Sequence, residues 1–594
     1  MTVFALLALS ALLLASAVLS NIVQAKIVEA EAEAEARRTA RSTLAQFEPG
    51  LLAYGLFGTK HRPESIASVA KAMDDGKKAE FASVGSDRFR AYDSASDPAP
   101  PVVEPLYHLG DHRVFQQQVL ERMKYIAAIE FAIEVSEKLA KSRTQLAQAQ
   151  QYAELSKRMT ELLNKREDAL DAAWTKAKSI ARDAGSGGGG LQRKVDEVAS
   201  KLSEAEKAND DLRKELNAPA PNMPTTPETL FPHVTVYPQT YFSGYRSDVA
   251  KIASLHAAWL KAKDAEPATE ESKAKEERLR ERAREAAGEW LREQGEKEEK
   301  RRRDGRKLQQ LQADQKKAAE QEINRRRDNW KDACELSDVA EYVELTKEGG
   351  LYEKYKLYNE HLSSGGMHEN LQKDDAESFL ESVLKLTQTV LEKAKEKRNE
   401  VYLNEYAITH FTYRTYDKQK FVGAVKTGIG DREAHRLQGQ EAEYILYGLP
   451  DCRLNLSAMH TELFALRTGL RTLEAMMRPN AASAAASPWM FVLASLTEGA
   501  KAANEDVELL LSGDAVELPF APSVTMDYRD HLRLFFLLHA REASAMSRMQ
   551  ALIELNTGID LMKTYTAVRV RMTYDTPFWV SKNRKKEIET VVSY

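Results

Sequence analysis

The chain has 594 residues, more than one hydrophobic core usually requires, so two or more structural units are expected. Its 85 basic and 90 acidic residues give a net charge of −5, which excludes an overall field that would attract nucleic acid. The basic runs at 301–303 and 325–327 lie among Glu and Asp and indicate a solvated helix face. The two cysteines, Cys334 and Cys452, exclude a disulfide framework, and either one long-range disulfide or two free thiols fits them.

The N-terminal segment carries the strongest physical signal. From Val3 to Val23 there is no charge, and a stretch of about 20 apolar residues is long enough to cross a lipid bilayer as a helix. A cleaved signal peptide competes with this interpretation, because Val23-Gln24-Ala25 resembles a cleavage site. We favour a retained anchor, because the run exceeds the ~7–15 residues of a signal core. Helix-forming residues also continue until Pro49-Gly50, which ends the predicted helix.

The charges that flank this segment bear on its orientation. No Lys or Arg precedes the apolar run, whereas Lys26, Arg37, Arg38 and Arg41 follow it. The positive-inside tendency alone would therefore place the rest of the chain in the cytoplasm. We expect the opposite, a single-pass cell-membrane protein with an extracytoplasmic bulk, on the hypothesis that a short basic lead precedes the given start.

The fold class predicted from periodicity is mainly α with minor β. After the N-terminal transmembrane and projecting helix (1–49) and an irregular segment (50–112), we expect a helical hairpin or coiled coil over 113–217. Its helix breaks at 185–190 and resumes at Leu191, and a flexible linker there remains an alternative. The remaining expected units are a Pro/aromatic segment (218–260), a charged insertion (261–335) and a C-terminal helix-rich globular domain (336–594).

Three patterns within these units give specific expectations. The prolines and aromatics of 218–245, including Tyr241 and Tyr245, indicate an ordered loop or short strands. The apolar stripe of 261–330, which includes Trp290 and Ile323, is too thin for a core and fits an exposed helix, a weak coiled-coil arm or disorder. Residues 528–562 read as an apolar helical pair. Alternation over Thr566–Tyr574 predicts a half-buried strand.

Several short stretches, in their order along the chain, carry a family resemblance. The first is the opening Thr2-Val3-Phe4 with its apolar helix. The others are 51–58 (LLAYGLFG), 118–125 (QVLERMKY), 403–406 (LNEY), 443–448 (EYILYG), 527–534 (DYRDHLRL) and 548–556 (RMQALIELN). Together they resemble TadE/TadG-like membrane-anchored proteins of Gram-positive bacteria, associated with tight-adherence (Flp-type) pilus systems. The resemblance covers roughly 1–60, 105–140 and 395–575.

This resemblance implies an extracytoplasmic body on a pilin-like helix, a role near pilus assembly or secretion, and no catalytic residues. The chain departs from a prepilin pattern, because no Gly precedes the apolar run and Leu6 and Leu7 lie where a Glu would be expected. From the residues themselves, Tyr444, Ile445 and Tyr447 are expected to face a core, with Gly448 ending their element. Asn404-Glu405-Tyr406 is expected to cap or lock a packing site.

The chain contains no phosphate-binding GxxxxGK[ST], no HExxH and no GxSxG. Gly428-Ile429-Gly430 lacks a third glycine and reads as a turn. His108 and His112 flank Gly110-Asp111, which argues against a helical metal pair. We therefore predict no catalytic, cofactor-binding or metal-ligating residues.

The function that follows is a non-enzymatic, membrane-anchored structural or assembly protein of the cell envelope. Its expected partners are the lipid bilayer, through Val3 to Val23, and envelope proteins, without nucleic acid. Two alternatives remain. One is an anchored or secreted hydrolase whose site is assembled from scattered residues, and the other is a cytoplasmic-facing coiled-coil scaffold.

Overall fold

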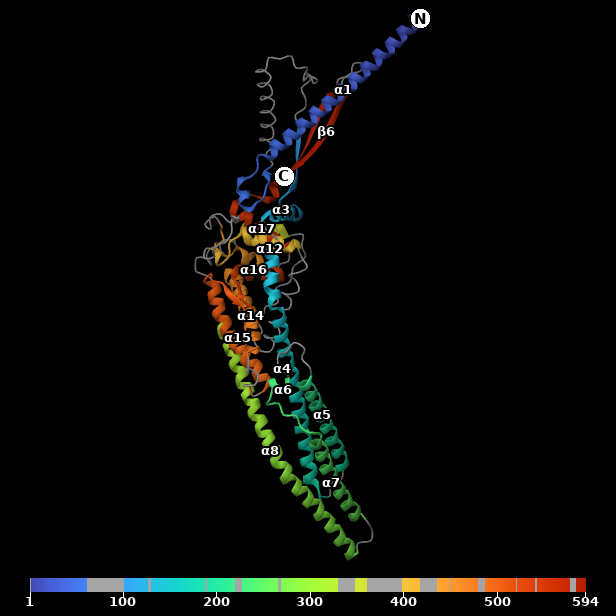
Figure 1. Ribbon diagram of the computed structural model, residues 1–594, viewed down its shortest axis with the longest axis vertical. Helices are drawn as coiled ribbons and strands as arrows, with labels where there is room; N and C mark the ends of the chain where they lie inside the picture. Colours follow the sequence, from blue (N-terminus) through green and yellow to red (C-terminus); the bar gives the residue numbers. More distant parts are fainter. Residues whose placement is uncertain are drawn as a thin grey trace.

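The protein is elongated and mainly helical, with a small antiparallel sheet near its N-terminal end (Figure 1). This computed structural model describes residues 2–60, 101–126, 130–186, 190–218, 227–264, 269–328, 348–359, 398–416, 435–449, 451–478, 485, 487–519, 521–539, 542–576 and 584–594. The predicted fold class, mainly α with minor β, is confirmed. An apolar helix projects from one end, a compact body lies in the middle, and a helical arm forms the other end.

The N-terminal helix α1 (Thr2–Leu44) is continuous, and the 3-10 helix η1 (Pro49–Tyr54) follows it. Pro49 occupies the first turn of η1, where a missing N–H costs no helical hydrogen bond. The end predicted at Pro49-Gly50 lies five residues beyond the helix terminus at Leu44.

Beside α1 lies a sheet centred on β5 (Thr564–Thr576), and all of its pairings are antiparallel. Strand β2 (Val102–His108) pairs with one edge of β5, and β1 (Thr59–Lys60) and β6 (Arg584–Ser593) pair with the other. The predicted strand Thr566–Tyr574 is thus confirmed within β5. Its alternation has the expected cause, because Val568 and Val570 are buried against α1.

The opposite face of this sheet is charged. Arg569 and Arg571 of β5 lie between Glu104 of β2 and Glu589 of β6. The four nitrogen–oxygen distances are 3.4 and 3.1 Å to Glu104 and 2.8 and 3.4 Å to Glu589. The sheet is therefore two-sided, with one face packed on α1 and one face solvated.

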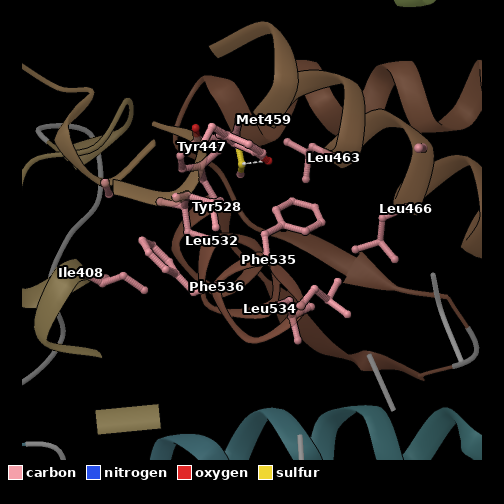
Figure 2. Packing of buried hydrophobic residues seen from close by; sticks show 14 of the residues in the cluster. Ile408, Tyr447, Met459, Leu463, Leu466, Tyr528, Leu532, Leu534, Phe535 and Phe536 are labelled. Atoms are coloured by element: carbon pink, nitrogen blue, oxygen red, sulfur yellow. Dashed lines mark hydrogen bonds between the residues drawn. The ribbon is translucent and has the colours of Figure 1, made fainter. Parts of the chain in front are cut away.

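The body is built from helices that surround one large apolar cluster. Figure 2 shows its centre, where Tyr528, Leu532, Phe535 and Phe536 lie beside Met459 and Leu463. Phe535 and Phe536 of α16 (Tyr528–His539) are 0% and 1% exposed. This helix is therefore apolar on more than one side and must lie in the interior. The body elements are α3 (His112–Ile126), α10 (Leu351–Asn359), α12 (Arg398–His410), α13 (Glu441–Tyr447), α14 (Cys452–Met476), α15 (Pro488–Leu511), β3 (Val516–Leu518), β4 (Ala521–Met526), α16 (Tyr528–His539), α17 (Glu542–Thr557) and η4 (Leu561–Lys563).

The arm consists of α4 (Glu130–Asp183), α5 (Leu191–Asn217), α6 (Pro227–Leu230), α7 (Gln239–Lys263) and α8 (Glu270–Asp328). A helix of 54 residues such as α4 is about 80 Å long. Ion pairs of Lys194 with Asp183 and of Lys176 with Glu197 show that α4 and α5 are antiparallel.

An aromatic cluster holds helices α4, α7 and α8 of the arm together. Trp174 of α4 and Trp290 of α8 have ring centroids 5.6 Å apart, and Tyr245 of α7 meets Trp290 edge-on at 5.7 Å. Arg301 of α8 binds Glu167 and Asp171 of α4, and its Nε donates to Glu298 at 2.9 Å. These contacts fasten α8 to the rest of the arm.

Two sequence expectations for this region are wrong. The apolar stripe of 261–330 does contribute to buried clusters: Trp290, 6% exposed, lies in the cluster of the arm, and Ile323, 2% exposed, lies in the cluster of the body. Ala283 and Ala287 precede Trp290 on the same face, and small side chains let helices approach closely where few large ones are present. The aromatic part of 218–245 is not loop or strand from Gln239 onward. Tyr241 and Tyr245 are four residues apart in α7, a spacing that places them on one helix face.

Candidate functional site: the anchor helix and its junction with the body

The first half of α1 has an uncovered apolar surface. It is the one helix in the described part of the chain that is long and apolar enough to cross a membrane, and none of its most apolar window is buried. Phe4 is 82% exposed, and Leu12, Leu13 and Leu14 are 63–70% exposed. We call residues 2–25 the anchor segment.

The second half of α1 is held by the sheet. Val28, Ala32, Ala36 and Ala40 recur every four residues, so they form a single narrow stripe along the helix. This stripe packs on Val568, Val570, Tyr574 and Ile588 of β5 and β6. The anchor segment therefore continues directly, without a hinge, into a helix fixed to the folded body.

The buried carboxylate of Glu441 helps to link η1, which follows α1, to the body. Glu441 of α13 is 0% exposed and accepts hydrogen bonds from His435 Nδ1 (2.6 Å), from the Thr412 N–H (3.0 Å) and from the Thr412 hydroxyl (3.1 Å). Asn556 of α17 donates to its other oxygen at 2.7 Å and to the Tyr54 phenol at 2.9 Å. Glu441 thus joins η1 to three separate parts of the body, and we call these five residues the junction cluster.

Residues 51–58 make further contacts on both sides of the junction cluster. The Tyr406 phenol donates to the carbonyl of Tyr54 at 2.8 Å, and His410 Nδ1 lies 3.1 Å from the carbonyl of Ala53. The side chain of Gln118 on α3 bonds the N–H and the carbonyl of Phe57 at 3.0 and 2.9 Å. Burial lowers the pKa of His410 to about 4, so its ring is neutral at pH 7.

Two acidic side chains, Glu405 and Glu443, fix α12 and α13 against α16. Glu405 accepts from Arg533 Nε at 2.8 Å and from Arg529 Nη2 at 3.2 Å. Glu443 accepts from the Tyr528 phenol at 2.6 Å and from the N–H of Arg414 at 3.0 Å. Complete burial raises the pKa of Glu443 to about 7, and the Tyr528 hydrogen bond opposes this rise. The expectation that Asn404-Glu405-Tyr406 locks a packing site agrees with these contacts.

Helix α13 ends as expected. Tyr444, Ile445 and Tyr447 are buried, and Gly448 has a left-handed φ of 68° that favours glycine. Arg548 of α17 donates to the carbonyls of Ile445 and Leu446 at 2.6 and 3.0 Å, where a helix terminus leaves carbonyls unpaired.

Six of the stretches that carry the family resemblance therefore meet in one region. They are 51–58, 118–125, 403–406, 443–448, 527–534 and 548–556, which are far apart along the chain. The sequence alone does not predict that these stretches touch. It also missed Glu441, His435 and the whole of β6, although Ile588 and Val592 carry a weak alternating signal.

The polar side chains around Glu441 join neighbouring helices through hydrogen bonds. The donors around Glu441 occupy both carboxylate oxygens, which leaves this group engaged within the fold. Among the described residues, no group of three His, Cys, Asp or Glu side chains is placed to hold a metal ion. His108 ends β2 and His112 begins α3, so the two do not form a pair on one helix. Gly428, Ile429, Gly430 and Cys334 lie outside the described residues.

Comparisons of the chain with protein-family models, with curated proteins and with solved structures found no match.

Proposed function

We propose that this chain is a non-enzymatic, single-pass membrane protein of the cell envelope that holds a long helical arm away from the bilayer. The observation that carries the proposal is the division of α1 into an exposed apolar half and a half fastened to the sheet. Fully burying one Leu side chain is worth about 1.5–3 kcal/mol, so an uncovered row of such side chains strongly favours transfer from water to lipid.

The attachment of α1 supports a structural role. Because α1 has no break between Thr2 and Leu44, the orientation of the anchor segment is transmitted to the sheet, and the junction cluster transmits it to the body. The arm extends from the opposite end of the body (Figure 1). A rigid chain of contacts of this kind suits a protein that presents a surface at a fixed distance from the membrane.

The buried charged groups support a non-enzymatic role. Glu405, Glu441 and Glu443 are engaged by Arg, His, Thr, Asn and Tyr side chains that come from other elements. Each carboxylate is used to join helices. A protein that works by holding its parts in place requires such contacts.

The narrower part of the proposal is an extracytoplasmic bulk that takes part in assembly of a tight-adherence pilus. The TadE/TadG-like stretches support it. Deletion of the gene is expected to reduce surface pili, and restoring the full chain is expected to recover them. Pili that are unchanged in number and length after deletion would overturn this part alone.

A labelling experiment tests the side on which the bulk lies. Lys214 on α5 is 78% exposed in its side chain, so Lys214→Cys in a C334S/C452S background provides one accessible thiol on the arm. A membrane-impermeant maleimide is expected to label this thiol in intact cells as fully as in lysed cells. Labelling only after lysis would instead support the cytoplasmic-facing scaffold, which the basic residues after the anchor segment would permit.

A further inference from the structure

The distal end of the β5–β6 pair lies beside the end of the anchor segment. Strand β5 runs antiparallel to α1: Val568 and Val570 pack near Ala40 and Leu44, whereas Tyr574 packs on Val28 and Ala32. The strands continue past Tyr574 to the pair Thr576↔Arg584. Two residues of a strand span about 7 Å, which equals the rise of between four and five residues of an α-helix. Counted from Val28 toward the N-terminus of α1, the pair Thr576↔Arg584 is therefore level with Gln24.

This level is where the uncharged stretch ends. Lys26 is the first charged residue of α1 and lies about 4–5 Å beyond Val23 along the helix axis. The polar headgroup layer on each side of a bilayer is about 5–7 Å thick. If α1 spans the bilayer, the end of the β5–β6 pair is therefore at the depth of the lipid headgroups.

The residues at this level are mainly basic. Arg584, Lys585 and Lys586 are consecutive on β6 and stand opposite Thr576, Asp575 and Tyr574 in the register. Lys585 and Lys586 are exposed. Of the nearby acidic residues on α1, Glu29 pairs with Lys26 at 2.7 Å and also lies within electrostatic range of Lys586. Glu587 and Glu589 follow on β6, farther from the anchor segment.

We propose that the basic end of β6 binds the headgroups of anionic phospholipids. This inference rests on the proposed membrane anchoring, and it adds a second attachment between the sheet and the bilayer. Lysine side chains at the membrane surface are attracted to negative lipids, and their long stems can follow the apolar boundary. Together with α1, this contact would fix both the tilt and the rotation of the body relative to the membrane.

The experiment uses the full chain reconstituted into vesicles of phosphatidylcholine that contain trace spin-labelled lipid. The measured quantity is the ratio of motionally restricted phosphatidylglycerol to motionally restricted phosphatidylcholine around the protein. We expect a preference for phosphatidylglycerol of about twofold or more at low salt, which falls toward one in 1 M salt because the charges are screened.

Three variants define the contact. K585Q/K586Q is expected to bring the ratio close to one, and K585R/K586R is expected to keep it, because the charge is retained. K201Q/K214Q is the matched control: the two lysine side chains are 43% and 78% exposed and lie on α5 of the arm, so the ratio should not change. A wild-type ratio of one, or a K585Q/K586Q ratio equal to that of wild type, would overturn the inference.

Failure of the anchor gives a different result. Wild-type protein that remains with the vesicles after an alkaline wash, yet shows a lipid ratio of one, contradicts only the headgroup contact. Wild-type protein that the same wash releases contradicts the anchoring itself.

Discussion

The Tyr528 phenol donates a 2.6 Å hydrogen bond to the Glu443 carboxylate, and both side chains are completely buried. This bond joins the first turn of α16 to α13 within a core whose other members are mainly apolar (Figure 2). Burial of an ionisable group at this position makes the stability of the body depend on pH.

The pH dependence has a definite sign. Because the pKa of Glu443 is about 7 in the folded state and near 4.5 when unfolded, the folded state retains the proton over this interval. Its contribution to stability is complete below pH 4.5 and is lost as the pH rises through 7. The loss is about 3 kcal/mol at ~1.4 kcal/mol per unit. Denaturant unfolding in detergent should show that Glu443→Gln gains stability relative to wild type between pH 5 and pH 8.

A second variant checks the cause. Tyr528→Phe removes the hydrogen bond that lowers the pKa of Glu443, so the loss of stability should shift to higher pH. A difference between Glu443→Gln and wild type that stays constant from pH 5 to pH 8 would contradict this explanation.

Asn556→Ala is expected to destabilise the body by about 2–3 kcal/mol, because a buried acceptor, the carboxyl group of Glu441, and the Tyr54 phenol lose their shared donor. Hydrogen exchange should accelerate at residues 51–58. Asn504→Ala is the control, since Asn504 bonds Glu508 within α15 alone, and exchange at 51–58 should not change. Equal effects of the two variants on that segment would show that the junction cluster does not hold it.

Two glycines with the same φ separate backbone strain from packing. Gly448 (φ 68°) lies against the Arg548 side chain, whereas a Cβ at Gly558 (φ 69°) would meet no atom within 4 Å. Both alanine variants bear the left-handed strain of about 1–2 kcal/mol, but Gly448→Ala also displaces Arg548 from the α13 carbonyls. We expect Gly448→Ala to lower the free energy of unfolding more than Gly558→Ala. Equal losses would mean that the Arg548 contact has no net effect.

Trp290→Ala should loosen α8 within the arm. The indole packs on Trp174 and Tyr245, and truncation of a buried Trp costs about 3–5 kcal/mol. Hydrogen exchange is expected to increase across α7 and α8 while α14 to α17 remain protected. Leu311→Ala, at a side chain that is 50% exposed on the same helix, serves as the control and should leave exchange unchanged. Equal loss of protection in α14 to α17 would show that the packing around Trp290 is not confined to the arm.

The sequence predicts those structural features that depend on residues within a single helix or strand. The uncharged stretch from Val3 to Val23 predicts α1, alternation around Val568 and Val570 predicts β5, and Gly448 predicts the end of α13. These signals are local, because helix length, strand period and a left-handed cap depend on neighbouring residues.

The junction could not be predicted in the same way. Glu441 and Asn556 are 115 residues apart, and no periodicity relates them. The burial of Trp290 was not predicted, because its partners are alanines and aromatic residues on other helices. The periodicity of one helix reports only the large apolar residues of that helix. Strand β6 was missed because acidic and basic residues fill its solvated face and dilute the alternation of Ile588 and Val592.

Anchoring of the chain by α1 can be measured by fractionating lysed cells, washing the membranes with alkaline carbonate, and identifying the N-terminal peptide by mass spectrometry. If α1 is the anchor, the full chain remains in the washed pellet with residues 2–23 intact. Full-length protein that carries these residues in the soluble fraction would contradict it.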